Sequence, residues 1–107
     1  MRIGLCTLHC CHTSCSLSLN ENWDPTVLID MEMSLNRIVP EGNFYRHDDE
    51  GSDDMPAHMK STLFGVNHTI PITNGKLVLG TWQGIYLCEH RDHPGNRSVV
   101  VTIQGTS

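Results

Sequence analysis

The sequence predicts an α+β protein with two helices and several strands, of which at least one pair is antiparallel. Three observations predict this class. Residues 3–12 alternate between two faces, as a β-strand does. Apolar residues recur at helical spacing between Pro25 and Pro40. An Asn74-Gly75 dipeptide then joins two strand-like segments, which is a strong hairpin signal. The chain has 107 residues, enough for a single domain over 1–107.

The first half of the chain predicts a strand followed by a helix. The strand covers 3–12, and an extended segment continues over 15–19. A helix is predicted over 25–37, with Asp24 as its N-cap and Pro25 as its first helical residue. Its apolar stripe consists of Val27, Leu28, Met31, Leu35 and Ile38.

The second half predicts one more helix and a run of strands. The helix covers 55–64, capped by Asp53 or Asp54 and closed by Gly65. The strands cover 66–72, 76–80, 81–90 and 98–104. Gly84 is a possible bulge, and the β-branched segment 98–104 is predicted to be buried on both faces.

Composition limits the classes of partner. The net charge is −5 with few lysines, which argues against a nucleic-acid partner. No apolar run approaches the roughly 20 residues that cross a bilayer, and no signal peptide is evident, so we expect a cytoplasmic protein without a membrane partner. Four of the five cysteines fall within the first fifteen residues. Reduced cysteines packed as small hydrophobic residues are the favoured interpretation, and a Cys/His zinc knot is the alternative.

An acidic segment between two histidines is the strongest chemical signal. His47 and His58 enclose five carboxylates, at Asp48, Asp49, Glu50, Asp53 and Asp54. Concentrated like charges repel one another, and a divalent cation would relieve that repulsion. The alternative is a solvated acidic loop. Asp54 and His58 are four residues apart, so they share one face of the predicted helix, and the carboxylate could orient a metal-bound imidazole.

Three phrases carry a family resemblance. They read HTSCSLSLNENWDPTV at 12–27, HDDEGSDDMPAHMKSTLFG at 47–65 and NGKLVLGTWQGIYLCEHR at 74–91. In order and spacing they resemble the YjbQ-type family of secondary thiamine-phosphate synthases, and the resemblance covers essentially the whole chain. Family members usually begin with two strands and a short helix ahead of the point where this chain starts, so these N-terminal strands are expected to be missing.

The resemblance implies a fold, an assembly and an activity. The fold is a mainly antiparallel β-sheet or sandwich, usually assembled as a homotrimer. The site is polar and holds a divalent metal in some members. The resemblance does not name the ion; imidazole and carboxylate ligands favour zinc, whereas pyrophosphate chemistry favours magnesium. The associated transferase activity joins a hydroxymethylpyrimidine pyrophosphate to a thiazole phosphate and releases pyrophosphate, so the expected partner is a small phosphorylated substrate.

The candidate site residues combine these signals. His12, His47 and His58 are the candidate metal ligands, and His58, Asp54 and Glu89 the candidate catalytic residues. Each histidine has a plainer alternative as a hydrogen-bonded structural residue. The candidate substrate-binding residues are Thr81, Gln83, Arg91, Glu21 and Asn22. Thr81 and Gln83 should point away from Trp82, which is expected to pack, and Arg91 is expected to meet phosphate.

Three other functions remain open. The chain could be a non-catalytic trimeric protein that binds a metal or ligand. It could be a hydrolase in which a zinc-bound hydroxide attacks a small molecule. It could also be an inactive shortened form, because loss of strands exposes a sheet edge and reduces core burial.

Overall fold

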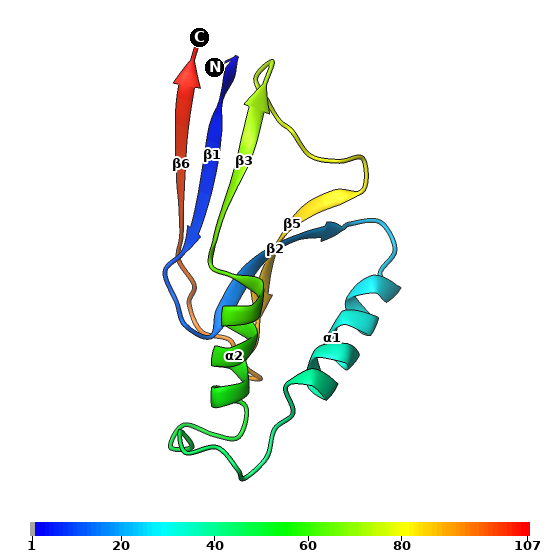
Figure 1. The fold of residues 1–107 in the computed structure, drawn as a ribbon, viewed down its shortest axis with the longest axis vertical. Helices are drawn as coiled ribbons and strands as arrows, with labels where there is room; N and C mark the ends of the chain where they lie inside the picture. The colour runs from blue at the N-terminus through cyan, green and yellow to red at the C-terminus, as the bar shows by residue number, and fades with distance from the viewer. Residues whose placement is uncertain (1) are drawn as a thin grey trace.

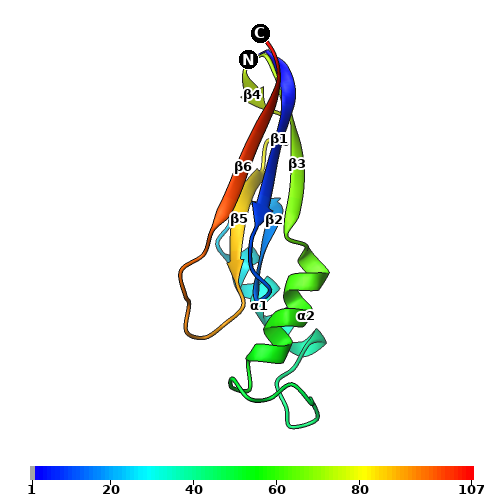
Figure 2. The same cartoon turned by 90° about the vertical axis from the view of Figure 1, so that its left-hand side faces the viewer.

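Two antiparallel sheets and two helices make up the computed structural model, which describes residues 2–107. The larger sheet has the strand order β4-β3-β1-β6; β3, β1 and β6 stand side by side in Figure 1, and the short β4 is labelled in Figure 2. Their bounds are β1 Ile3–Cys10, β3 Asn67–Thr73, β4 Lys76–Leu77 and β6 Val99–Thr106. The predicted α+β class with antiparallel sheet is confirmed.

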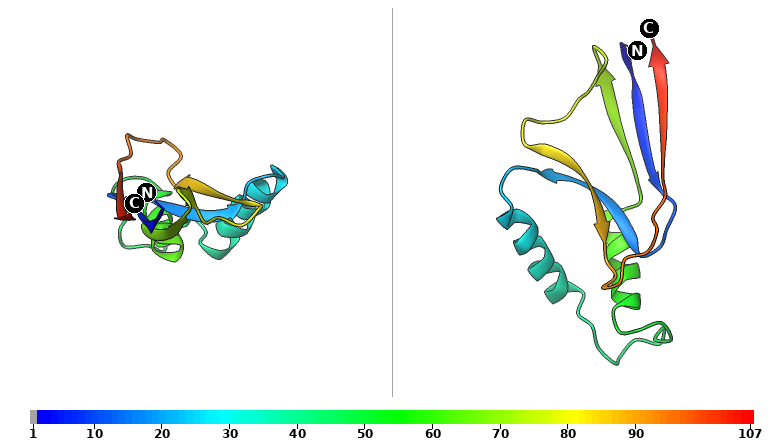
Figure 3. Two further views of the ribbon diagram at one scale, coloured as in Figure 1. Left: turned by 90° about the horizontal axis from the view of Figure 1, so that it is seen from above. Right: turned by 180° about the vertical axis from the view of Figure 1, so that it is seen from behind.

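The smaller sheet is a two-stranded ribbon of β2 (Cys15–Glu21) and β5 (Gln83–Glu89). It crosses below the larger sheet, as the views in Figures 1 and 3 show. Its register pairs Cys15 with Glu89 at one end and Glu21 with Gln83 at the other. This register decides which candidate site residues can meet, because the two ends lie six residues apart along each strand.

The hairpin predicted at Asn74-Gly75 joins β3 to β4. Asn74 has a φ of 52° and Gly75 a φ of 75°. Two successive residues with positive φ are what a type I′ turn requires, and Asn-Gly is the dipeptide that tolerates it best. Only Thr73–Lys76 and Ile72–Leu77 pair as strand residues, so the second arm is shorter than the predicted 76–80.

Gly84 is not a bulge. The β2–β5 register runs through it without interruption, with Gly84 opposite Asn20. A Cβ added at this position would lie 2.6 Å from the Cβ of Asn22. The glycine therefore permits a close approach between the chain that leaves β2 and the start of β5.

The core lies where β1 and β3 meet the first half of β2. Apolar side chains from all three strands pack here, and they are Cys6, Leu8, Cys10, Cys15, Leu17, Ile70 and Ile72. The interpretation of cysteines as small packing residues holds for the three within this cluster, whereas Cys11 is exposed.

β6 contradicts the prediction of a strand buried on both faces. Every residue of β6 is exposed, including Val100 at 52% and Ile103 at 56%. It pairs with β1 on one side and has no strand on its other side within the described part of the chain. β-branched residues favour the extended conformation, but they do not specify what covers it.

Helix α1 (Thr26–Ile38) stands apart from the large sheet and leans over the β2–β5 ribbon (Figures 1 and 2). Pro25 occupies the N-cap position, one residue later than predicted. Asp24 nevertheless accepts hydrogen bonds from the Thr26 amide and hydroxyl at 2.9 and 2.8 Å, and the bond from the amide is the kind that a capping side chain makes. No residue of α1 is buried. Of its predicted apolar stripe, only Val27, Met31 and Leu35 are half-buried.

Helix α2 (Asp54–Phe64) packs beside the start of β2. Asp53 is its N-cap residue, and Gly65, with a φ of 92°, ends it. The Ser61 hydroxyl donates to the Cys15 carbonyl at 2.7 Å, which fixes the helix against the ribbon. Nearer the start of the helix, His58 reaches the Thr13 carbonyl and Asp54 meets Arg91, just after β5.

The molecule is elongated, measuring 53 × 28 × 19 Å along its principal axes. Its radius of gyration is 16.0 Å, compared with about 13 Å for a compact chain of this length. The sheet and α1 therefore diverge rather than enclose one core. Among the described residues, no helix has the length and apolarity to cross a membrane.

Candidate metal and substrate site

Asp54, in the first turn of α2, is the centre of the candidate site. Its side chain is 1% exposed. Its Oδ2 lies 2.8 Å from Nε2 of His47 and 3.3 Å from Nε2 of His58. Its Oδ1 accepts a hydrogen bond from Nη1 of Arg91 at 2.6 Å. A buried carboxylate thus has a cation on one side and two imidazoles on the other.

The helical repeat of α2 and the loop between the two helices together bring His58 and His47 to Asp54. The helical repeat places His58 one turn above Asp54, as the sequence predicts. His47 arrives through the loop between the helices, and its ring centroid lies 5.3 Å from that of His58. Asp48, Asp49 and Glu50 in the same loop are exposed, so the solvated interpretation applies to them.

The tautomer of His58 leaves a lone pair facing the carboxylate. Nδ1 of His58 lies 2.8 Å from the Thr13 carbonyl, which can only accept, so Nδ1 carries the hydrogen. In the neutral ring, Nε2 then has a lone pair directed at Oδ2 of Asp54. Two lone pairs repel unless a proton or a cation lies between them. The Thr13 carbonyl, rather than Asp54 as expected, orients the ring.

The donor set fits a divalent metal. One ligand atom each from His47, Asp54 and His58 can be chosen so that all three lie within 4.8 Å of one another. Two imidazole nitrogens and one carboxylate oxygen are a ligand set of catalytic zinc sites, which leave the fourth position for water or substrate. Oxygen-preferring magnesium suits this set less well.

His12 lies outside this cluster. Its Nε2 accepts a hydrogen bond from the Ser98 amide at 2.7 Å, so that nitrogen is occupied in the fold. With His58 it lines a second hollow of about 540 Å³ next to α2. The structure therefore brings two of the three candidate histidines together and replaces the third with Asp54.

Arg91 is engaged by the acidic segment. Besides Asp54 it contacts Asp53, with Nε 3.2 Å from Oδ2, and it donates from Nη2 to the Glu50 carbonyl at 2.8 Å. The Asp92 amide, which donates to Asp53 at 2.7 Å, lowers the pKa of that carboxyl, and Arg91 adds to the effect. Arg91 borders the pocket described below and contacts Asp54, so it lies between that pocket and the candidate metal ligands.

Glu89 is held by an ion pair. Arg97 donates from Nε to Oε1 at 2.7 Å and from Nη2 to Oε2. This side-chain hydrogen bonding lowers the pKa of Glu89 below its ordinary value, despite an opposing effect of desolvation. Nη2 of Arg97 also donates to the Ser14 hydroxyl at 3.0 Å. Glu89 thus anchors the turn between β1 and β2.

Four candidate substrate residues lie at the far end of the ribbon. Glu21, Asn22, Thr81 and Gln83 occupy the end opposite Glu89. Six strand residues span about 20 Å, so within one chain these side chains do not share a pocket with Asp54. Trp82, which was expected to pack, is 58% exposed and stacks edge-to-face against Trp23 at 6.0 Å between ring centroids.

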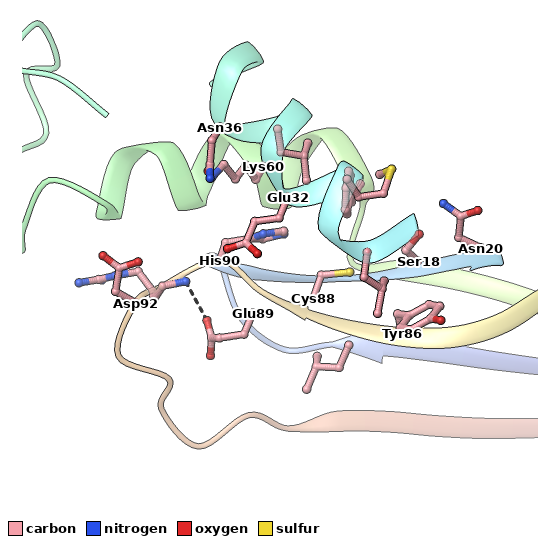
Figure 4. Close-up of a pocket in the computed structure, with 16 residues that line it drawn as sticks. Ser18, Asn20, Glu32, Asn36, Lys60, Tyr86, Cys88, Glu89, His90 and Asp92 are labelled. Atoms are coloured by element: carbon pink, nitrogen blue, oxygen red, sulfur yellow. Dashed lines mark hydrogen bonds between the residues drawn. The ribbon is translucent and has the colours of Figure 1, made fainter. Parts of the chain in front are cut away.

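A pocket of about 370 Å³ lies between α1 and the β2–β5 ribbon. Figure 4 shows its polar residues, with Glu32 and Asn36 on α1 and Tyr86, Cys88 and His90 along β5 and just beyond it. Leu28, Met31 and Leu35 supply an apolar wall. Sequence periodicity indicated the apolar side of α1, but it gave no signal for this pocket, because the pocket depends on how α1 crosses the ribbon.

His90 lies in this pocket and is predicted to make stability depend on pH. Burial lowers the pKa of His90 to about 4, and the Lys60 charge adds to the effect. The unfolded chain titrates near the ordinary value of 6.5, so between these values it binds a proton that the folded chain does not. Stability should therefore fall by about 2 kcal/mol as pH drops from 6.5 to 4, after allowance for solvent screening.

Urea unfolding across this pH range measures the effect. His90→Gln retains a polar group next to the Ser16 hydroxyl, which lies 2.8 Å from Nε2 of His90, and should flatten the profile. His93→Gln, at an exposed position, is the matched control and should leave the profile unchanged. If the stability of His90→Gln fell with decreasing pH as steeply as that of the wild type, the pH dependence could not be assigned to His90.

Comparison with models of protein families identifies the family to which the chain belongs. The model of the family described as "UPF0047 protein YjbQ-like" matches residues 1–106. The chain belongs to the YjbQ/UPF0047 family. The UPF0047 protein YjbQ of Salmonella typhimurium is 54% identical over 102 residues, covering 95% of this chain and 74% of the relative. The protein of the same name from Escherichia coli O157:H7 is 51% identical, covering 98% and 76%.

Solved structures of YjbQ/UPF0047 relatives have the same fold. An uncharacterised member from Clostridium acetobutylicum superimposes with a TM-score of 0.89 at 39% identity, covering 97% of this chain and 78% of that one. A hypothetical protein from Aeropyrum pernix gives a TM-score of 0.88 at 28% identity, covering 98% and 76%. The resemblance drawn from the three sequence phrases is therefore confirmed at the level of family and fold.

Proposed function

We propose that this YjbQ/UPF0047 protein is a metal-dependent transferase with secondary thiamine-phosphate synthase activity. It would join a hydroxymethylpyrimidine pyrophosphate to a thiazole phosphate and release pyrophosphate. The convergence of His47, Asp54 and His58 next to a pocket of mixed polarity carries the proposal. Family membership supports it through the activity associated with YjbQ-type proteins.

The chain's own residues would bind and position the reactants. A bound divalent metal would supply charge neutralisation for the pyrophosphate leaving group. Arg91 lies at the border of pocket and ligands, where a guanidinium can add hydrogen bonds to phosphate oxygens. A carbon–nitrogen bond forms as the carbon–oxygen bond to pyrophosphate breaks, and the thiazole nitrogen supplies the electron pair. The reaction needs positioning more than it needs a general base.

The apolar wall of α1 opposite Tyr86 and His90 suits a substituted pyrimidine ring. A flat ring gains contact area against Leu28, Met31 and Leu35, and its ring nitrogens can pair with the polar side. The near absence of basic residues in the pocket, apart from Lys60 and Arg91, makes the metal the main partner for pyrophosphate.

A zinc-dependent hydrolase is the second candidate. The observation that favours it is the donor set, because two imidazoles and a carboxylate suit zinc, whereas pyrophosphate chemistry commonly uses magnesium and oxygen ligands. Water in the open coordination position would then be the nucleophile. A non-catalytic metal-binding protein would use the same three ligands without the pocket.

We further propose a homotrimer as the working assembly. The exposed edge strand β6, with its apolar residues on both faces, supports burial against a further copy. The distance of Glu21, Asn22, Thr81 and Gln83 from Asp54 also supports this assembly. These residues would contribute to substrate binding only at a site on a neighbouring copy.

Metal analysis combined with an activity assay tests the function. We expect purified protein to bind zinc, and His58→Ala to lower both zinc affinity and thiamine-phosphate formation by about 100-fold or more, since even outer-shell changes cost 10- to 100-fold. His93→Ala, on an exposed turn, is the control and should leave both unchanged.

The outcomes separate the candidates. Full activity in His58→Ala would refute the assigned site. Zinc binding that is lost in His58→Ala, together with no thiamine-phosphate formation by wild type under any divalent metal, would refute the transferase and leave the hydrolase or the binding protein. Hydrolysis of chromogenic ester and phosphoester substrates by the wild type then identifies the hydrolase.

A further inference from the structure

Two buried thiols face each other at the base of the turn between β1 and β2. Cys10 is the last residue of β1 and Cys15 the first of β2. Their sulfur atoms lie 2.9 Å apart, and the two residues are 1% and 0% exposed. Even two carbon atoms in contact are separated by about 3.5–4.0 Å, so these larger atoms are held unusually close.

The backbone on both sides of this pair is fixed by hydrogen bonds. The Cys10 amide donates to the Val66 carbonyl at 2.7 Å, and the Cys15 carbonyl accepts from the Ser61 hydroxyl at 2.7 Å. The Cys11 amide donates to the Ser98 carbonyl at 3.1 Å. The fold therefore brings the two sulfurs together, and a bond between them, at about 2.05 Å, needs movement of less than 1 Å.

We propose that Cys10 and Cys15 are a modification site, at which a reversible disulfide closes the turn of residues 11–14. The oxidant is a low-molecular-weight disulfide such as oxidised glutathione. One cysteine thiolate attacks a glutathione sulfur, which releases one glutathione and leaves a mixed disulfide. The other cysteine thiolate attacks the protein-side sulfur and releases the second glutathione. The two protein thiols lose two protons and two electrons, and the glutathione disulfide gains them.

The remaining cysteines are less suited to this pairing. Cys11 is exposed and lies just beyond the end of β1, where its thiol donates to the His9 carbonyl at 3.9 Å. Cys6 lies four residues before Cys10 on β1, and Cys88 pairs across the ribbon with Ser16. The described residues thus offer one close thiol pair.

The turn that this bond would close also serves the candidate metal site. It contains Thr13, whose carbonyl orients His58, and Ser14, whose hydroxyl accepts from Arg97. Burial raises the pKa of the Cys15 thiol to about 12, and the neighbouring Cys10 thiol adds to the effect. The thiolate is scarce at neutral pH and both thiols are buried, so the exchange requires transient opening of the turn and should take minutes to hours.

Thiol counting tests the proposal directly. The wild-type protein is incubated with oxidised glutathione, quenched with acid, denatured and alkylated with N-ethylmaleimide. We expect three of the five cysteines to be labelled, against five after dithiothreitol treatment. The oxidised protein should also melt about 10 °C higher, because a short closed loop removes entropy from the unfolded chain.

Variants and peptide mapping locate the bond. Cys10→Ala and Cys15→Ala should each abolish the paired loss of labels, whereas Cys6→Ala and Cys11→Ala should retain it. In the wild type, tandem mass spectrometry of the peptide that contains both cysteines should show no backbone fragments between positions 10 and 15 before reduction. Five labelled cysteines after oxidation, or a bond mapped to another pair, would overturn the proposal even if a variant failed to fold.

Discussion

Asp54→Asn is expected to lower zinc affinity by about 100-fold and to destabilise the metal-free protein by about 2–3 kcal/mol. The affinity falls because an amide oxygen is a weaker zinc ligand than a carboxylate. The stability falls because Arg91 loses the closest of its charged partners within a mostly buried contact, although Asp53 remains beside it. Calorimetric titration with zinc and urea unfolding measure the two effects.

Asp48→Asn is the matched control for this prediction. It makes the same change of charge in the same acidic segment, but at an exposed side chain. Both zinc affinity and stability should remain within experimental error of the wild type. A folded Asp54→Asn protein with wild-type zinc affinity would remove Asp54 from the ligand set.

Ile70→Ala is expected to destabilise the protein by about 3 kcal/mol. Ile70 is 2% exposed and pairs with Cys6 across β1 and β3, at the centre of the apolar cluster. The side chain packs with residues of β1 and β2, and both strands are held by their own pairing, so the cavity left by truncation cannot readily collapse. Urea unfolding monitored by circular dichroism measures the loss.

Ile29→Ala provides the comparison for the core variant. Ile29 lies on α1 and is 65% exposed, so the same deletion removes little contact. Alanine also favours the helix over isoleucine by a few tenths of a kcal/mol. The change should be close to neutral, and equal losses for the two variants would place the core elsewhere.

Local periodicity explains what the sequence could predict. Both helices and the Asn74-Gly75 hairpin follow from patterns that span one or two turns of chain. The pairing of Asp54 with His58 is of the same kind, since it depends only on the helical repeat. The two helices lie within one residue of their predicted bounds and the turn lies at its predicted residues, because these features depend mainly on neighbouring residues.

Tertiary arrangement explains what the sequence could not predict. His47 reaches Asp54 through an irregular loop, and His12 is turned to the Ser98 amide by the neighbouring strand. Alternation predicted a strand over 81–90, but Thr81 and Trp82 lie in the turn ahead of β5, and the pattern carried no information on which end of the ribbon meets α2. The prediction that β6 is buried was wrong for a related reason. The β-branched composition of this strand does not reveal which strands lie next to it.

Helix α1 has a dynamic consequence for the pocket that it borders. A helix without a buried residue has little to lose on detaching, so α1 should be among the segments of lowest local unfolding free energy. One wall of the cavity can then move outward while the ribbon and the candidate metal ligands stay in place. Reactants would enter and leave through transient fraying of this wall, and its rate would limit turnover if chemistry is faster.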